Sequence, residues 1–366
     1  MTEIKYVPLG ELIKKAKIVR CDNNEYPILS MTMHKGLIFQ DEKFKKTIAS
    51  KDTSSYKVVF RNQLVVSFPI DEGVLATQRI TDAGIVSPAY DIWDINQEQV
   101  LPEYLEYCLR CERALQYYKS KLRGSTARRR SLPTPTLLAF TIPLIDISQQ
   151  KSVLEIIHKS KSILEKRENE LQTLDELIKA RFVEMFGGYA ERRKLVEYAE
   201  LITKGASPKW QGLDYCEEGT LFVTSENVRE GFVDLSKRKY LPNAINEILP
   251  RSVLKRNDIL INIVGASIGR AAIFNCDELA NINQAVALVR INPIKINKLF
   301  LITFLNSEDA QKSYGFMKKG GARDNLSLKN ISDLMIPVTT IDEQNEFAEF
   351  VQEVDKSKVV VQLAYY

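Results

Sequence analysis

The chain has 366 residues and a mass of 41.8 kDa, more than one ordinary hydrophobic core holds, so we expect two or three domains. Hydrophobic residues make up 45% and charged residues 27%, a composition that excludes a disordered chain. The net charge of +4 is small, so any nucleic-acid surface must come from local clusters of Lys and Arg.

No stretch of the sequence approaches the roughly 20 apolar residues that a membrane-spanning helix needs. The first residues, MTEIKYVPLGELIKK, lack the apolar core of a signal peptide. The five scattered cysteines are an odd number and do not form a disulfide framework. We therefore expect a reducing, cytoplasmic environment.

The first part of the chain alternates short β-branched runs with one longer helical pattern. Strands are predicted at Lys57–Phe60, Leu64–Phe68 and Ile85–Ser87. A helix is predicted at Pro102–Ser120. This mixture predicts a first α+β domain over residues 1–147.

A basic loop follows the predicted helix. Residues 119–130 read KSKLRGSTARRR, with six basic residues around a Gly-Ser-Thr turn. Such a loop presents positive charge and flexible backbone to a row of phosphates. A solvated surface loop is the alternative interpretation. We predict DNA contacts by Lys119, Lys121, Arg123, Arg128, Arg129 and Arg130.

The next segment is the clearest helix in the sequence. The chain from Ser148, a possible N-cap, to Phe186 contains no Gly or Pro, and Gly187-Gly188 can end the helix. At 1.5 Å per residue it would be roughly 55–60 Å long. Apolar residues recur every seven positions, which is typical of a coiled-coil seam. We predict a spacer helix at residues 148–188 with an interface formed by Ile157, Leu164, Leu171, Ile178 and Met185.

The last part repeats the alternation of the first. Strands are predicted at Leu221–Thr224, Ile259–Val264 and Val286–Ile291, and a helix at Ile296–Ser313. These elements predict a second domain over residues 189–340. A distal helix is expected over residues 341–366. It should pack on the spacer helix through Phe347, Phe350, Val351 and Val354.

The second domain carries its own candidates for DNA contact. The stretch ITKGASPKWQG contributes two cations and an indole, and VTSENVREG contributes polar side chains of the kind that read base edges. A place at the edge of the core would explain the latter equally well. A glycine-rich basic stretch, KKGGARDN, starts at residue 318. The predicted DNA-binding residues are Lys204, Lys209, Trp210, Ser225, Asn227, Lys318, Lys319 and Arg323.

A long-period repeat relates the two domains. RRSLPTPTLLAFTIPLIDISQQ (129–150) aligns without a gap with RDNLSLKNISDLMIPVTTIDEQ (323–344), 194 positions later. Upstream, residues 58–68 and 253–263 share an Arg-Asn pair ahead of an apolar strand. Those Arg-Asn pairs fit a functional role or a simple turn before the strand. The common order of the matches indicates a duplicated domain.

Catalytic signals are weak. The only histidines are His34 and His158, and Cys108-x-x-Cys111 has no second pair that would complete a zinc site. The sequence Ser87-Pro88-Ala89-Tyr90 is faintly similar to the catalytic loop of adenine-N6 methyltransferases. No Phe-x-Gly-x-Gly cofactor loop precedes it, and no Walker loop occurs. We predict no catalytic centre and no metal site.

Each predicted domain ends in a Leu-x10-Pro block followed by an Ile-x-x-Gln helix start. The blocks are Leu132 to Pro143 with Ile147-x-x-Gln150, and Leu326 to Pro337 with Ile341-x-x-Gln344. With RFVEMFGG at the end of the spacer helix and KGASPKW after it, this order resembles the specificity (S) subunits of type I restriction–modification enzymes. The resemblance covers almost the whole chain. It implies an α+β fold of two duplicated mixed α/β target-recognition domains joined by long coiled-coil-type helices.

The resemblance also implies a function. Each domain would read one half of a split double-stranded DNA target, and the antiparallel helices would set the spacing. Two methyltransferase (modification) subunits, which use S-adenosylmethionine, would bind the helices, and restriction subunits can join through them. The chain itself would hold no cofactor. DNA contact is carried over to the loops Lys119–Arg130 and Lys318–Arg323.

One feature departs from the family. The distal helix here ends at Tyr366 and is shorter than usual. We expect that another copy or a partner completes the helical bundle. Two other functions are weighed. The domains could be the recognition portion of a self-contained DNA methyltransferase or nuclease, which the missing cofactor loop disfavours. A coiled-coil scaffold without DNA function is disfavoured by the duplicated basic loops.

Overall fold

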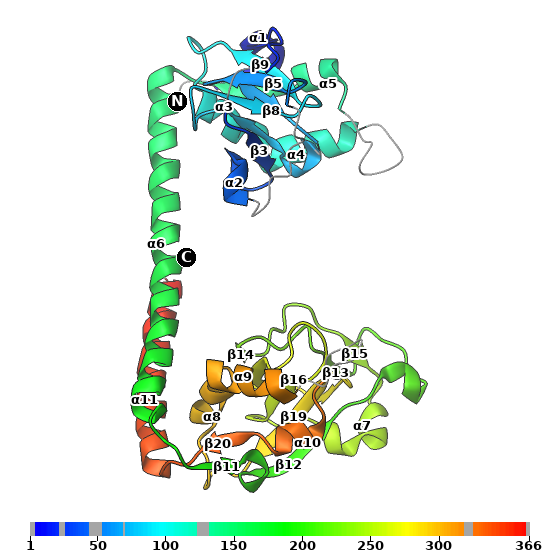
Figure 1. The fold of residues 1–366 in the computed structure, drawn as a ribbon. Helices are drawn as coiled ribbons and strands as arrows, with labels where there is room; N and C mark the ends of the chain where they lie inside the picture. The colour runs from blue at the N-terminus through cyan, green and yellow to red at the C-terminus, as the bar shows by residue number, and fades with distance from the viewer. Residues whose placement is uncertain are drawn as a thin grey trace. The chain divides into compact units, whose positions relative to one another are not determined.

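The computed structural model describes residues 4–21, 26–43, 53–68, 70–122, 132–317 and 325–363 (Figure 1). The chain divides into two compact units, Met1–Leu164 and Glu165–Tyr366, and the division falls inside a long helix. Each unit mixes helices and strands, which confirms the predicted α+β class. The finer division into four segments stays a prediction.

The first unit consists of short strands and helices followed by the start of the long helix α6. Its elements are β1 (Lys5–Pro8), α1 (Leu9–Leu12), β2 (Ile13–Lys15), β3 (Leu29–Thr32), β4 (Gly36–Phe39), α2 (Gln40–Lys43), β5 (Lys57–Phe60), β6 (Leu64–Val66), η1 (Ile70–Glu72), β7 (Leu75–Thr77), β8 (Ala83–Val86), β9 (Asp91–Ile95), α3 (Pro102–Arg110), α4 (Glu112–Lys121), α5 (Thr134–Leu138) and β10 (Thr141–Leu144).

The second unit contains the rest of α6 (Ile147–Phe186) and the elements that follow it. These are β11 (Arg192–Lys194), η3 (Leu195–Glu197), β12 (Ala199–Lys204), η4 (Pro208–Gln211), β13 (Thr220–Val223), β14 (Gly231–Phe232), β15 (Tyr240–Leu241), α7 (Ile245–Ile248), η5 (Pro250–Ser252), β16 (Ile259–Asn262), β17 (Ala271–Ile273), β18 (Ala280–Ile282), β19 (Val286–Ile291), α8 (Lys298–Leu305), α9 (Glu308–Met317), α10 (Leu328–Ser332), β20 (Met335–Pro337) and α11 (Ile341–Leu363).

The main sheets of the two units share one strand order. The first is β2-β9-β6-β7, and the second is β12-β19-β16-β17-β14. The central pairs are antiparallel in both, with Leu64 opposite Trp93 and Ile259 opposite Val289. A smaller pair, β1–β10 in the first unit and β11–β20 in the second, also recurs. The duplication inferred from the sequence is therefore a duplication of the fold.

The predicted strands are present, with ends shifted by a few residues. Val286–Ile291 and Lys57–Phe60 have the predicted bounds. The strand predicted to reach Phe68 ends at Val66, and the one predicted to reach Val264 ends at Asn262. Beyond these ends the chain still makes single backbone bonds, from Ser67 to Val74 and from Ile263 to Ala285, but the regular strand pairing stops.

We predicted one long helix in each domain, at Pro102–Ser120 and at Ile296–Ser313. The continuous helix was wrong in both cases, because each region contains two shorter helices, α3 with α4 and α8 with α9. The first breaks at Cys111, whose backbone is extended, with φ −69° and ψ 160°. The second breaks at Asn306, whose side-chain amide pairs with both backbone groups of Ala271 on β17. Because the Asn306 side chain bonds to the backbone of β17, the residue is held in a position that does not continue the helix.

Helix α6 begins one residue before the predicted start. The carbonyl of Asp146 accepts the amide of Gln150, and Ser148 lies within the first turn, so the predicted Ser148 N-cap was wrong. The helix ends at Phe186, and the amide of Gly187 still bonds to Val183. A Cβ on Gly187 would lie 2.6 Å from the Val183 carbonyl oxygen, so glycine is needed at this end.

The two ends of α6 are anchored by residues outside the predicted seam. Leu154 is buried in the core of the first unit. Phe182 and Phe186 are buried in the core of the second, and both rings pack on Phe300 of α8. Of the predicted seam, only Ile178 and Met185 join that core, and both are partly exposed.

The distal helix α11 packs antiparallel to the last turns of α6 within the second unit, as predicted (Figure 1). Phe347 packs on Phe182 with ring centroids 5.4 Å apart. Further along, Lys358 forms an ion pair of 2.7 Å with Asp175. Of the side chains predicted on this face, Phe347, Val351 and Val354 are buried, whereas Phe350 is partly exposed.

A buried glutamine joins each of these helices to the helices and strands of its own unit. The Gln150 Oε1 accepts the amide of Leu101, which precedes α3, at 2.8 Å. The Gln344 Oε1 accepts the amide of Asn297, which precedes α8, also at 2.8 Å. Each Nε2 also donates to a carbonyl five residues earlier in its own segment. The glutamine of the Ile-x-x-Gln motif therefore fixes the start of one helix to the start of another.

Candidate nucleic-acid interface

The end of strand β16 brings several loops of the second unit together. The Asn262 amide donates to the Ser225 carbonyl at 3.0 Å and to the Ser267 hydroxyl at 2.9 Å. The next residue, Ile263, bonds through its backbone to Ala285 and Leu326. Loops that are distant in sequence thus meet at one edge of the sheet, an arrangement that builds a composite binding surface.

The turn between β16 and β17 lies at the centre of this edge. Its glycines, Gly265 and Gly269, both have φ of +86°. A Cβ on Gly269 would lie 2.4 Å from the ring of Tyr314 on α9, so α9 packs directly on the turn. Asn325 pairs with Val264 of the same turn. The predicted basic stretch lies between Met317 at the end of α9 and Asn325, and both flanks are held at this turn.

The predicted residue Lys204 is exposed at the end of β12, and Lys209 and Trp210 are exposed on η4, which follows it. The Trp210 side chain is 76% exposed. A cavity of about 180 Å³ lies beside them, lined by Lys209, Tyr215 and Gln284 among others. The Gln284 Oε1 is buried and has no hydrogen-bond partner among the described residues. An exposed indole and an exposed ammonium group are suited to nucleic-acid contact.

The structure removes Asn227 from the base-reading set. Its side chain is 8% exposed. The Oδ1 accepts both the backbone amide and the hydroxyl of Thr224, and the Nδ2 donates to the carbonyls of Asp234 and Lys237. Because its side-chain oxygen and nitrogen both hold its own loop together, Asn227 is not available to contact a base. The prediction that it reads DNA was therefore wrong. Ser225 is half-buried, and its carbonyl is held by Asn262.

The first unit presents the equivalent edge. Lys119 and Lys121 are exposed in the last turn of α4. Helix α4 packs on η1, in the turn between β6 and β7, just as α9 packs on the turn between β16 and β17. The remaining predicted DNA-binding residues lie outside the described residues. They are Arg123, Arg128, Arg129, Arg130, Lys318, Lys319 and Arg323.

The repeated Arg-Asn pair lies at the opposite end of the central strand and forms a turn. Asn62 and Asn257 have φ of 71° and 72°, the left-handed conformation that asparagine tolerates. Arg61 pairs with Asp82 at 2.9 Å, and Arg256 pairs with Asp277 at 2.7 Å. Of the two interpretations left open, the structure therefore supports the turn before the strand.

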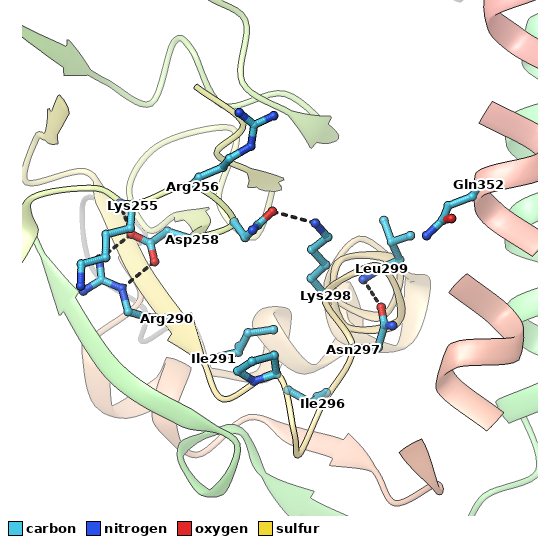
Figure 2. Close-up of a pocket in the computed structure, with 12 residues that line it drawn as sticks. Lys255, Arg256, Asp258, Arg290, Ile291, Ile296, Asn297, Lys298, Leu299 and Gln352 are labelled. Atoms are coloured by element: carbon cyan, nitrogen blue, oxygen red, sulfur yellow. Dashed lines mark hydrogen bonds and ion pairs between the residues drawn. The ribbon is translucent and has the colours of Figure 1, made fainter. Parts of the chain in front are cut away.

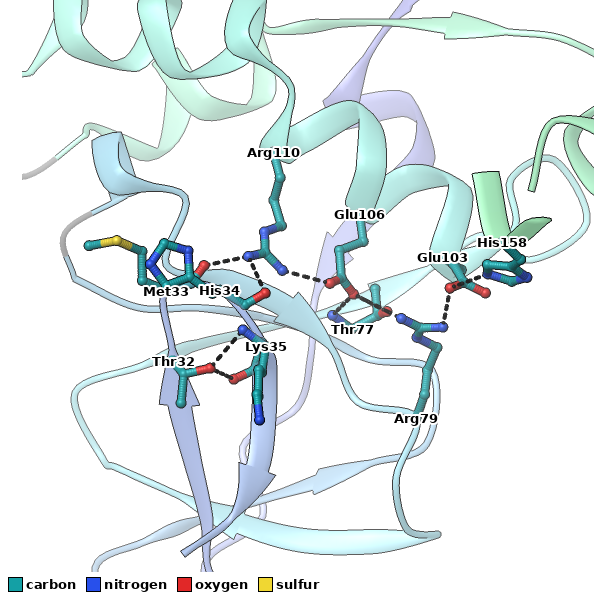
Figure 3. Close-up of polar contacts among 11 residues, drawn as sticks. Thr32, Met33, His34, Lys35, Thr77, Arg79, Glu103, Glu106, Arg110 and His158 are labelled. Atoms are coloured by element: carbon teal, nitrogen blue, oxygen red, sulfur yellow. Dashed lines mark hydrogen bonds and ion pairs between the residues drawn. The ribbon is translucent and has the colours of Figure 1, made fainter. Parts of the chain in front are cut away.

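A charged network that the sequence did not predict supports one hairpin of the first unit. Glu106 is 8% exposed and accepts the amide and hydroxyl of Thr77 at 2.8 and 2.7 Å. Arg110 bonds to Glu106 and reaches the carbonyls of Met33 and His34 in the turn between β3 and β4 (Figure 3). The exposed tip of this hairpin is thereby fixed. The only sequence signal was the i, i+4 spacing of Glu106 and Arg110.

His158, which is exposed on α6, contacts the same region. Its Nε2 lies 2.9 Å from the Glu103 Oε1, and Arg79 pairs with that carboxylate at 2.7 Å (Figure 3). Partial burial pushes the pKa of Glu103 upward. Hydrogen bonds from His158 and Arg79 outweigh this effect and leave the pKa below its ordinary value. Within the first unit, this contact ties α6 to α3.

The predicted helix interface remains largely accessible in its central part. Leu164 is 44% exposed, and Ile157 and Leu171 are half-exposed. On the adjacent face, Ile156 is 65% exposed and Ile163 is 58% exposed. These apolar side chains lie on a helix whose charged residues already pair along its length, as Arg167 does with Glu170.

No group of three or more His, Cys, Asp or Glu residues that could hold a metal ion occurs in the described parts of the chain. The Cys111 Sγ donates to the Cys108 carbonyl, and burial raises the pKa of the Cys108 thiol to about 11. A thiol so reluctant to ionise is a poor metal ligand. None of the described helices is long and apolar enough to cross a bilayer.

Comparison with known proteins identifies the class of this fold. A family model described as the type I restriction modification DNA specificity domain matches residues 193–360. The specificity subunit of the type I restriction enzyme EcoBI from Escherichia coli is 33% identical over 142 residues, which cover 38% of this chain and 29% of that protein. The MjaVIII specificity subunit from Methanocaldococcus jannaschii is 22% identical over 233 residues, 58% of this chain and 55% of its own length. The matched segments thus span about half or less of the length of these two relatives.

Two solved structures share the fold across the whole chain. One describes complex assembly and conformational transition of the type I R-M system, with a TM-score of 0.60 and 16% identity. The other is the type I restriction–modification S subunit from M. genitalium, with a TM-score of 0.53 and 13% identity. Each similarity covers 100% of this chain and 93% of the other.

The second unit therefore carries a DNA-specificity domain of the type I restriction–modification class, and the first unit repeats its central sheet. The chain is thus similar to type I specificity subunits, in sequence over part of its length and in fold over all of it.

Proposed function

We propose that this chain is the DNA-reading subunit of a type I restriction–modification complex, in which each recognition domain reads one half of a bipartite target. The proposal rests on one feature that occurs in both units, at the end of the central strand of each main sheet. In each unit, the helix before the basic stretch packs on the turn that follows the central strand. A basic stretch at the same place in two copies of one domain suits two separate half-targets.

The proposed partners are double-stranded DNA and two methyltransferase subunits, with restriction subunits joining through these. The exposed apolar residues along α6, among them Leu164, are suited to a protein interface because contiguous exposed apolar surface favours association. The chain would hold no cofactor, and S-adenosylmethionine would bind to the methyltransferase partner. The complex would work in the cytoplasm, where the DNA is.

The proposal also holds that the chain has no catalytic activity of its own. The purified chain should neither transfer the methyl group of labelled S-adenosylmethionine to DNA nor cleave DNA. Methyl transfer by the isolated chain would instead support the alternative, a self-contained methyltransferase.

Modular recognition is tested by a domain exchange. Residues 195–340 would be replaced by the matching segment of a relative, and the methylome of the expressing cells would be sequenced. We expect one half of the methylated target to change and the other half to stay the same. A simultaneous change in both halves would show that the domains form one composite reading surface.

The basic loop is tested by salt dependence. Replacing Arg128, Arg129 and Arg130 with Ala should weaken binding to every DNA sequence. The slope of log affinity against log salt should flatten by about 0.9 for each phosphate that the variant no longer neutralises. An unchanged slope would assign these residues to solvated surface.

A further inference from the structure

The second unit contains a cavity at the edge of the sheet opposite the candidate DNA interface. It encloses about 390 Å³ beside the turn that precedes β16, the end of β19 and the start of α8 (Figure 2). This volume lies within the range of about 300–1,000 Å³ typical of ligand sites. Gln352 of α11 also lines the cavity, so its rim includes the distal helix.

The cavity is lined by four cations and one carboxylate. Arg290 is neutralised by Asp258, which is 2% exposed and accepts two bonds from the guanidinium at 2.7 and 2.8 Å. Arg256 pairs with the exposed Asp277. Lys298 donates to the neutral amide oxygen of Asn257 at 2.7 Å. In the described parts of the chain, no carboxylate contacts the ammonium group of Lys255 or Lys298.

The floor of the cavity is apolar. Ile291, Ile296 and Leu299 line it, and Pro293 lies at its edge. The neighbouring Ile294 is 84% exposed. An apolar floor with unneutralised lysines at the rim complements a ligand that combines carboxylates with an apolar side chain.

The first unit lacks three of these four cations at the corresponding positions, and only Arg256 has a counterpart, Arg61. Lys255, which precedes the Arg-Asn turn, corresponds to Phe60, and Lys298, the first residue of α8, corresponds to Pro102, the first residue of α3. Arg290 corresponds to Asp94, by its place next to the Ile259–Val289 pair. The charge is therefore not required by the shared fold. It distinguishes the second domain from the first.

We propose that this cavity binds an acidic peptide segment of a protein partner, with an apolar side chain on the floor and carboxylates on Lys255 and Lys298. Because Gln352 places the rim on the distal helix, a protein bound along α11 can reach the cavity. Identifying that protein as a methyltransferase subunit rests on the proposed function, whereas the peptide chemistry does not. An apolar floor adds nothing to the binding of a DNA backbone, whose affinity comes from neutralised phosphates.

The test uses the full chain with labelled isoleucine methyl groups, so that Ile291 and Ile296 report from the floor. The probe is an equimolar pool of acetylated hexapeptides that alternate Asp or Glu with Leu or Phe. We expect both signals to shift, with half-saturation below about 1 mM. A matched pool with Lys in place of the acids should cause no shift.

A charge-reversal pair sharpens the test. Lys255→Glu with Lys298→Glu should weaken peptide binding at least tenfold. The control, Arg251→Glu with Lys312→Glu, carries the same change in net charge on exposed residues outside the cavity and should bind as the unmodified chain does.

Four results would overturn the proposal. They are no shift with the acidic pool, equal shifts with inorganic phosphate alone, displacement of the peptides by a DNA duplex, and equal weakening by the control pair. DNA affinity is measured on the same variants. Unchanged DNA binding together with weakened peptide binding supports the inference, and a chain that binds no DNA at all contradicts the proposed function instead.

Discussion

The two recognition domains share one arrangement of strands and helices. They differ in the pair of polar residues that links the start of the central strand to the neighbouring strand. In the second domain Asp258 and Arg290 form a buried ion pair. In the first domain the same two positions hold Gln63 and Asp94, joined by one hydrogen bond of 2.7 Å. The glutamines Gln150 and Gln344, by contrast, keep the same contact in both. The contact of the glutamines was retained, whereas the pair formed by Asp258 and Arg290 at the cavity has diverged.

The largest expected effect contrasts the two polar pairs. Asp258→Ala leaves the guanidinium of Arg290 without its partner and should cost the second unit about 3–5 kcal/mol of stability. Gln63→Ala removes the partly exposed bond from an uncharged amide to Asp94, together with the bond from the Phe60 amide, leaves no buried charge, and should cost about 1–2 kcal/mol. Hydrogen exchange of β16 reports the second unit, and fluorescence of the buried Trp93 reports the first. Equal costs would show that the ion pair has no special role.

The two equivalent glutamines should behave alike. Gln150→Ala and Gln344→Ala each leave a buried amide of the helix start unsatisfied, so each should cost its own unit about 1–3 kcal/mol. The same two probes measure the effect. A matched control, Gln149→Ala, changes an exposed neighbour and should have little effect. Destabilisation of only one unit would break the equivalence of the two domains.

A smaller effect depends on pH and is specific to the second unit. Glu343 accepts bonds from the hydroxyls of Thr339 and Tyr189 and from Thr340, which lower its pKa from 4.5 to about 2. A carboxyl whose pKa is lower in the folded state contributes stability above its ordinary pKa. That contribution should disappear as the pH falls from 4.5 towards 2. Hydrogen exchange at the start of α11 measures it, and Glu343→Gln should abolish the dependence in that window.

The smallest effect on stability is expected at the exposed part of the predicted seam. Leu164 is 44% exposed, so Leu164→Asp should change the stability of the free chain by less than about 0.5 kcal/mol. It should nevertheless impair assembly with methyltransferase subunits, because it places a charge in a proposed interface. Ile178→Asp, within the second core, should destabilise the chain itself. Normal assembly and methylation by the Leu164 variant would remove this residue from the interface.

The sequence alone determined the large-scale organisation. The 194-residue repeat predicted the duplicated domain, and the run without Gly or Pro predicted the long helix that the structure places at Ile147–Phe186. The distal helix and its buried face were also predictable. These features follow from local periodicity and from long matching blocks, which are both readable along one dimension.

Only the tertiary structure decided which polar residues are occupied and which remain available. The sequence suggested that Asn227 reads bases, but in the structure its side-chain amide holds its own loop. The role of the glutamine in Ile-x-x-Gln, which is to accept the amide of Leu101 or Asn297, is visible only in the structure. Asp258 and Arg290 are 32 positions apart and meet because β16 and β19 pair in one register. Such contacts depend on strand register and helix packing, which a single sequence does not encode locally.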